Sequence, residues 1–94
     1  MKRVDLTLAD SPKQASYTTS EIVDDQAVII NLNAGVYISL NETGSFLWQR
    51  LDGKTTLESI AADLARAYDV EESVTRPDVL ALALALLSEG YITL

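Results

Sequence analysis

Apolar and β-favouring residues gather in three short stretches in the first half of the chain, and this pattern predicts three β-strands. The strands are expected at residues 17–23, 27–32 and 36–40. Runs of turn-forming residues, Asp24-Asp25 and Asn33-Ala34-Gly35, separate them. Strands joined by such short turns pair antiparallel with their neighbours, so the pattern predicts a three-stranded meander.

The two-residue period also assigns side chains to faces of this sheet. One face of the second strand is expected to carry Val28, Ile30 and Leu32. The inward side of the third strand is expected to carry Val36, Ile38 and Leu40, with Tyr37 and Ser39 on the opposite face.

After residue 40 the apolar spacing becomes helical. Asn41 is a suitable N-cap for a first helix, which Asp52-Gly53 is expected to end. Thr56 is a suitable N-cap for a second helix. Its apolar residues recur at i, i+3, i+4 and i+7: Leu57, Ile60, Ala61, Leu64 and Tyr68.

A third helix follows a polar connection expected at residues 69–75. Pro77 fits its first turn and Gly90 its end, with a short closing strand after that glycine. Residues 79–87 are apolar without a break, so the helix has two adjacent apolar stripes. They consist of Val79, Leu82, Ala83 and Leu86, and of Leu80, Leu84 and Leu87. One stripe closes the core, and the other needs a further partner.

The predicted order of elements gives an α+β fold, with a three-stranded antiparallel sheet followed by three helices in a winged-helix-like outline. Residues 1–14 mix charged, Ser and Pro residues without periodicity, and we expect them to form a flexible lead-in. Residues 15–94 are expected to form a single domain.

The amino-acid composition argues against most kinds of catalytic and metal-binding site. The chain has no Cys and no His, which excludes thiolate ligands, Cys nucleophiles and Ser-His-Asp arrangements. We expect no catalytic residues, metal or cofactor, because the adjacent carboxylates at Asp24/Asp25 and Glu71/Glu72 are typical of solvated turns. No segment approaches the ~18 apolar residues of a membrane span, and residues 1–15 lack a signal-peptide core. A soluble, cytoplasmic protein is expected.

The formal net charge of −7 disfavours nucleic acid as a partner. The third predicted helix begins with Arg76 and Asp78 and continues with apolar residues, whereas a recognition helix presents basic and amide side chains to DNA. A degenerate winged-helix DNA binder is therefore a minor alternative.

Peptide recognition remains. The third predicted strand offers an edge to which an incoming peptide can add as a further strand, and the apolar third helix can form the second wall of a groove. The alternative is that strand and helix simply pack on each other, while the surplus leucines complete the core or the interface of a homodimeric scaffold. The apolar pattern does not separate these two interpretations.

From Val28 to Ile92 the sequence resembles the PqqD-like family of precursor-peptide recognition domains, also called RiPP recognition elements. The resemblance rests on an ordered series of matching runs: residues 37–53, 55–60, 64–70, 78–79 and 86–91. They are similar to the family's strand with its Leu-Asn corner, first helix and Asp-Gly stop, second helix, and final helix with its terminal glycine.

This resemblance implies binding of a precursor's leader peptide as an added strand between the third strand and the third helix. The chain is similar to free-standing recognition proteins of lasso-peptide pathways, which work beside a leader peptidase and a cyclase. A chaperone of the PqqD type, for another modified peptide or for a cofactor pathway, is the nearest alternative. The expected oligomeric state is a monomer or weak dimer.

The resemblance also implies roles for particular residues. The backbone pairing with the leader would come from Val36, Tyr37, Ile38 and Ser39. Apolar pockets would be formed by Val79 and Ala83, or by Leu80, Leu84 and Leu87. Arg76 is a candidate partner for an acidic leader side chain, with a solvated surface arginine as the alternative.

Overall fold

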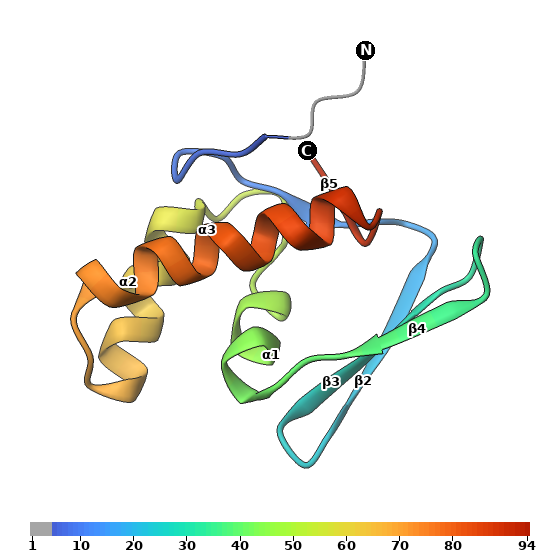
Figure 1. Ribbon diagram of the computed structural model, residues 1–94, viewed down its shortest axis with the longest axis horizontal. Coiled ribbons are helices and arrows are strands. Elements are labelled where there is room, and N and C mark those ends of the chain that lie inside the picture. Colours follow the sequence, from blue (N-terminus) through green and yellow to red (C-terminus); the bar gives the residue numbers. More distant parts are fainter. Residues whose placement is uncertain (1–4) are drawn as a thin grey trace.

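The computed structural model describes residues 5–94 and has an α+β architecture (Figure 1). An antiparallel sheet is formed, in this order, by β2 (Thr18–Val23), β3 (Gln26–Asn31) and β4 (Val36–Ser39). The helices that follow are α1 (Glu42–Trp48), α2 (Leu57–Tyr68) and α3 (Glu72–Ser88). The predicted class, a three-stranded meander followed by three helices, is confirmed.

The turn between β2 and β3 is formed by two aspartates with positive φ, 51° at Asp24 and 63° at Asp25. Aspartate tolerates this left-handed conformation, and two-residue turns of this kind match the twist of a hairpin. The turn fixes the register, because it places Val23 opposite Gln26.

Val28 and Ile30 share one face of β3 as predicted, and the alternate set of side chains faces the core. Ala27 and Ile29 are fully buried, and the side chain of Asn31 is buried beside them. Ile30 and Leu32 lie on the outer face instead, 41% and 63% exposed. Both faces of β3 carry apolar residues, so the two-residue period marks alternate positions without showing which set faces the helices.

A buried serine attaches the sheet to α1. Asn41 caps the helix as predicted, with its Oδ1 accepting the N–H of Gly44 at 2.9 Å. One turn later, Ser45 Oγ accepts the backbone N–H of Ala27 at 2.6 Å and donates to the carbonyl of Asn41 at 2.7 Å. This joins β3 to the first turn of α1. The helix ends at Trp48, before the predicted stop at Asp52.

The third helix starts earlier than expected. It begins at Glu72, so most of the predicted connection is helical and Pro77 lies inside the helix. The buried side chain of Thr75 donates to the carbonyl of Ala61 in α2 at 2.7 Å. This tertiary contact fixes the first turn of α3 against α2, which local sequence could not indicate.

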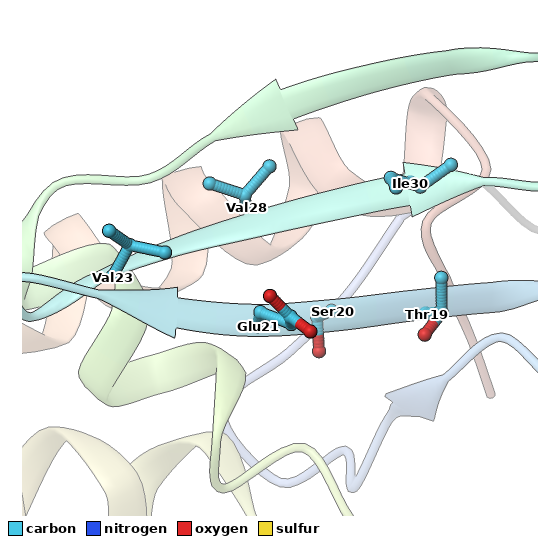
Figure 2. A pocket seen from close by; sticks show the side chains of 6 residues that line it. All are labelled: Thr19, Ser20, Glu21, Val23, Val28 and Ile30. Carbon is cyan, nitrogen blue, oxygen red and sulfur yellow. The ribbon is translucent and has the colours of Figure 1, made fainter.

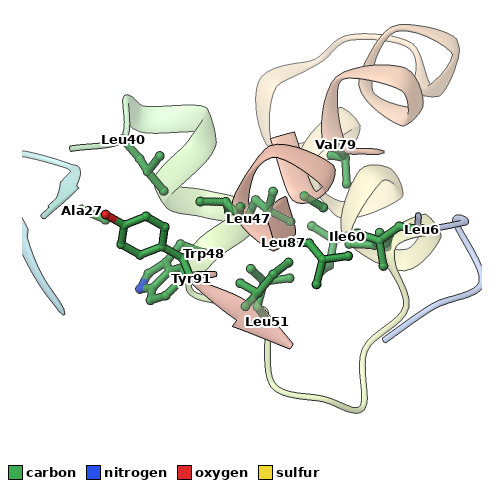
Figure 3. Close-up of a cluster of buried hydrophobic side chains, with 14 of the residues drawn as sticks. Leu6, Ala27, Leu40, Leu47, Trp48, Leu51, Ile60, Val79, Leu87 and Tyr91 are labelled. Carbon is green, nitrogen blue, oxygen red and sulfur yellow. The ribbon is translucent and has the colours of Figure 1, made fainter. Parts of the chain in front are cut away.

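The core lies between the inner face of the sheet and the three helices (Figure 3). From α3 it receives four buried apolar side chains, which are those of Val79, Ala83, Leu86 and Leu87. Leu82 was grouped with this stripe in the sequence but is only partly buried, whereas Leu87, from the other stripe, is buried.

Residues 5–14 differ from the expected flexible lead-in. β1 (Lys13–Gln14) pairs antiparallel with the closing strand β5 (Ile92–Thr93). Leu6 and Pro12 are buried, and Leu6 belongs to the core. The remainder of the predicted lead-in, residues 1–4, lies outside the described residues. Two isolated buried side chains leave no periodic signal, so the sequence pattern did not reveal this packing.

Candidate peptide-binding groove

Within residues 5–94, β4 pairs only with β3, so its other edge is free. The N–H of Leu40 donates to the carbonyl of Ala27 at 2.8 Å, which fixes the alternation of hydrogen bonds along the strand. Val36 and Ile38 therefore direct their backbone groups to β3. Tyr37 and Ser39 direct theirs to the free edge.

The side chains of β4 also divide into two sets. Val36 and Ile38 lie opposite Asn31 and Ile29, so they share the inner face of the sheet. Val36 is 51% exposed, whereas Ile38 packs partly against the core. The side chain of Tyr37 lies on the outer face and is 70% exposed. A peptide beside β4 would thus meet apolar side chains on the inner side.

One flank of α3 faces the end of this edge, because β4 leads directly into α1 beneath α3 (Figure 1). A Cβ built on Gly44, in the first turn of α1, would lie 3.2 Å from Cδ2 of Leu82. A small cavity of about 40 Å³ lies between the two helices, with Asp78 and Leu82 among its lining residues. Leu82 is therefore the half-buried apolar residue of α3 that is closest to the route of β4.

The opposite flank of α3 carries three of the predicted site residues. Arg76 pairs with Glu72 of its own helix at 2.8 Å and with Glu58, at the start of α2, at 3.7 Å. Leu80, one turn further on, and Leu84 continue this flank, and both pack partly against the core. The structure places these residues toward α2 and away from β4.

The remaining predicted helix residues, Val79, Ala83 and Leu87, are buried in the core. The structure thus keeps the four residues of β4 on one free edge and places Leu82 of α3 near the end of that strand. Leu82 was not among the predicted candidates, because two adjacent apolar stripes do not show which one faces β4. The proximity of Gly44, visible only in the fold, indicates it.

Comparison with known proteins identifies the family of this chain. Residues 26–92 match the model of a family described as coenzyme PQQ synthesis protein D (PqqD), a region that includes both β4 and α3. This chain belongs to the PqqD family. Among curated protein sequences, none matches it.

Solved structures similar to this PqqD family protein include two leader-peptide complexes. TbiB1 in complex with the TbiA(beta) leader peptide has a TM-score of 0.78 and 25% identity, covering 85% of this chain and 93% of that one. Lasso peptide synthetase B1 complexed with its leader peptide has a TM-score of 0.79 and 24% identity, covering 89% and 99%.

The third similar structure is the PqqD truncation of Methylobacterium extorquens PqqCD, described as a functional, stand-alone RiPP recognition element. Its TM-score is 0.81 at 16% identity, with 97% of both chains covered. At this low identity the likeness concerns the fold.

The outer face of the sheet is a second exposed apolar surface of this PqqD family protein. A hollow of about 250 Å³ lies between β2 and β3, lined by Thr19, Ser20, Glu21, Val23, Val28 and Ile30 (Figure 2). Val23 is 53% exposed. The alternation of Val28, Ile30 and Leu32 was the sequence signal for this surface.

The pKa values of Asp52 and Tyr68 are shifted, and both shifts have structural causes. Hydrogen bonds from the backbone N–H groups of Lys54 and Thr55 lower the pKa of the Asp52 carboxyl group. The same hydrogen bonds organise the loop before α2. Partial burial and a hydrogen bond with Glu42 raise the pKa of Tyr68. Neither group lies at the free edge of β4.

Two further features are absent from residues 5–94: a cluster of metal-ligating side chains and a membrane-spanning helix. No group of three potential metal-ligating side chains occurs in this part of the chain. Nor does any of its helices have both the length and the apolar character required to cross a bilayer.

Proposed function

We propose that this PqqD family protein binds the leader segment of a ribosomally made precursor peptide as a fourth strand beside β4. The observation that carries the proposal is the free edge of that strand. There the backbone groups of Tyr37 and Ser39 lie open, and the strand leads to Gly44 of α1, which lies beside Leu82 of α3. The structural neighbours that were captured with leader peptides support it.

The edge offers two N–H and two C=O groups from Tyr37 and Ser39. Each hydrogen bond made there contributes about 0.5–1.5 kcal/mol net. Burial of two or three large apolar side chains adds about 1.5–3 kcal/mol each. Together these offset the cost of ordering a flexible peptide and give binding in the nanomolar to micromolar range.

The geometry also specifies the leader's side chains. Alternate residues of an added strand point to opposite faces of the sheet. Those on the inner face would meet Val36, Ile38 and Leu82, so we expect apolar residues at every second position of the bound segment. The intervening positions lie on the outer face beside Tyr37 and tolerate polar residues.

We assign the protein a non-catalytic role in the cytoplasm, in a lasso-type pathway with a leader peptidase and a cyclase as partners. The neighbour described as lasso peptide synthetase B1 favours this pathway. A leader held on β4 keeps the core peptide close to an enzyme bound at a second surface, which raises the local substrate concentration to roughly millimolar.

The outer face of the sheet is the surface that we assign to the peptidase. It is apolar and exposed, and a leader strand added to β4 would extend it without covering it. Tyr37 connects the two surfaces, since its backbone faces the leader and its side chain lies on the outer face.

The test is a fluorescence anisotropy titration of the labelled leader peptide from a precursor gene beside this one. Tyr37→Pro removes an N–H at the free edge and keeps the bonds of β4 to β3, because Val36 is already extended. We expect it to weaken binding about fivefold to tenfold.

Ile22→Pro is the matched control. The N–H of Leu32 donates to the carbonyl of Tyr17, so the N–H of Ile22 faces the free edge of β2, on the far side of the sheet. This variant should bind like the wild type. Equal weakening by both prolines, or wild-type binding of a scrambled leader, would contradict the proposal.

A further inference from the structure

An apolar pocket lies beyond the end of β4, between the start of α1, the end of α2 and the start of α3. Its volume is about 210 Å³. We call it the helical pocket, and its main lining residues are Thr43, Leu64, Tyr68, Val70, Val74 and Asp78. None of the predicted site residues lines it.

The helical pocket continues the peptide groove. Thr43, Leu64 and Asp78 line both this pocket and the small cavity beside Leu82. Because β4 leads into α1, the route along the free edge passes Ser39, then the first turn of α1, and then reaches the pocket. The pocket is therefore continuous with the small cavity beside Leu82, which lies where β4 leads into α1.

The apolar lining combines the core residue Leu64 with side chains that are exposed. Val70 and Val74 are 45% and 53% exposed, so they add little to the core. Val74 lies in the first turn of α3, where polar or acidic residues are preferred. Tyr68 is 37% exposed, and its ring is held edge-on against Phe46, with 6.1 Å between the centroids. The result is a preformed apolar pocket that is open to solvent.

The surrounding charge restricts what can enter. Asp78 lines the pocket, and Asp69 and Glu71 lie in the turn between α2 and α3. Arg66 and Arg76 are paired with Asp63 and Glu72. Arg50 lies over the ring of Phe46, where Glu42 also approaches Tyr68. An acidic peptide side chain would be repelled here, whereas an uncharged apolar one would not.

We infer that the leader extends past the end of β4 and places one large aliphatic or aromatic side chain in the helical pocket. This inference rests on the proposed function and deepens it, because the leader then requires an apolar anchor outside the segment that pairs with β4. The anchor lies at the end of the bound strand that is next to Ser39.

The test compares two labelled peptides from the neighbouring precursor. One is the whole leader, and the other is the shortest fragment whose binding Tyr37→Pro still weakens, which defines the paired strand. Val74→Asp places a charge in the pocket at a helix position that favours acidic residues. Val23→Asp is the matched control, because Val23 is equally exposed, at 53%, on the outer face.

We expect Val74→Asp to weaken binding of the whole leader roughly tenfold or more and to leave the fragment unaffected. Val23→Asp should change neither affinity. A photo-crosslinking residue at position 74 should attach to a leader residue outside the fragment, which locates the anchor independently.

Two failures can be distinguished. If Val74→Asp binds the whole leader like Val23→Asp while Tyr37→Pro still weakens it, the pocket inference is wrong and the proposed function stands. If the wild type shows no saturable binding of the whole leader, the proposed function fails and the pocket inference fails with it.

Discussion

At the scale of single residues, the hydroxyl of Ser45 determines how the sheet meets the helices. Ser45 is 1% exposed, and its Oγ accepts the N–H of Ala27 while donating to the carbonyl of Asn41. The first of these bonds is needed because a backbone N–H buried without a partner is costly. The hydroxyl thereby fixes the end of β4 relative to α1, and hence one end of the groove.

Ser45→Ala should lower the free energy of unfolding by about 1–3 kcal/mol, since it leaves the buried N–H of Ala27 without its acceptor. Urea denaturation measures the change. Ser88→Ala, at an exposed position at the end of α3, is the control. A loss no larger than that of the control would show that the hydroxyl does not join the two elements as described.

At the scale of elements, α3 has two half-buried flanks with different surroundings. Leu82 faces Gly44 and the end of β4, whereas Leu80 shares the flank of Arg76, which pairs with Glu58 at the start of α2. The side of α3 that lies between these two flanks is buried in the core. The buried side of α3 thus packs in the core, and only its Leu82 flank would meet a peptide on β4.

Leu82→Gln should weaken leader binding by about tenfold, because it replaces an apolar contact at the groove with a polar group. Leu80→Gln makes the same chemical change on the other flank and should leave the affinity near that of the wild type. Anisotropy titration measures both, with circular dichroism to verify folding. Stronger weakening by Leu80→Gln would reverse the assignment of the flanks.

At the scale of the whole molecule, the protein is thin, with extents of 37 × 36 × 19 Å. The peptide groove and the outer face of the sheet therefore lie close together without overlapping. Tyr37 belongs to both, through its backbone and its side chain respectively. An enzyme on the outer face would lie beside the bound leader and within reach of the core peptide that follows it.

Ile30→Asp should slow cleavage of the precursor by the pathway's leader peptidase by about tenfold, because it places a charge in the apolar outer face. The affinity for the isolated leader should not change, since the side chain lies on the face away from α3. Cleavage is followed by mass spectrometry with purified proteins. Normal cleavage by a folded variant would remove the peptidase from this surface.

The sequence by itself determined the elements that depend on local physics. Asn41 and Thr56 cap their helices as predicted, because a side-chain oxygen can satisfy an end N–H wherever the helix starts. The three strands also appear where alternation and turn residues placed them. Residues 36–39 were therefore predicted as the edge strand that the structure contains.

The tertiary structure decided everything that depends on contacts between distant residues. Thr75 fixes the first turn of α3 through Ala61, and Leu6 is buried through contacts that no local pattern encodes. Gly44 shows which flank of α3 faces the groove. Periodicity gives the spacing of apolar positions along one element, but the direction each face points is set by the neighbours that the folded chain brings to it.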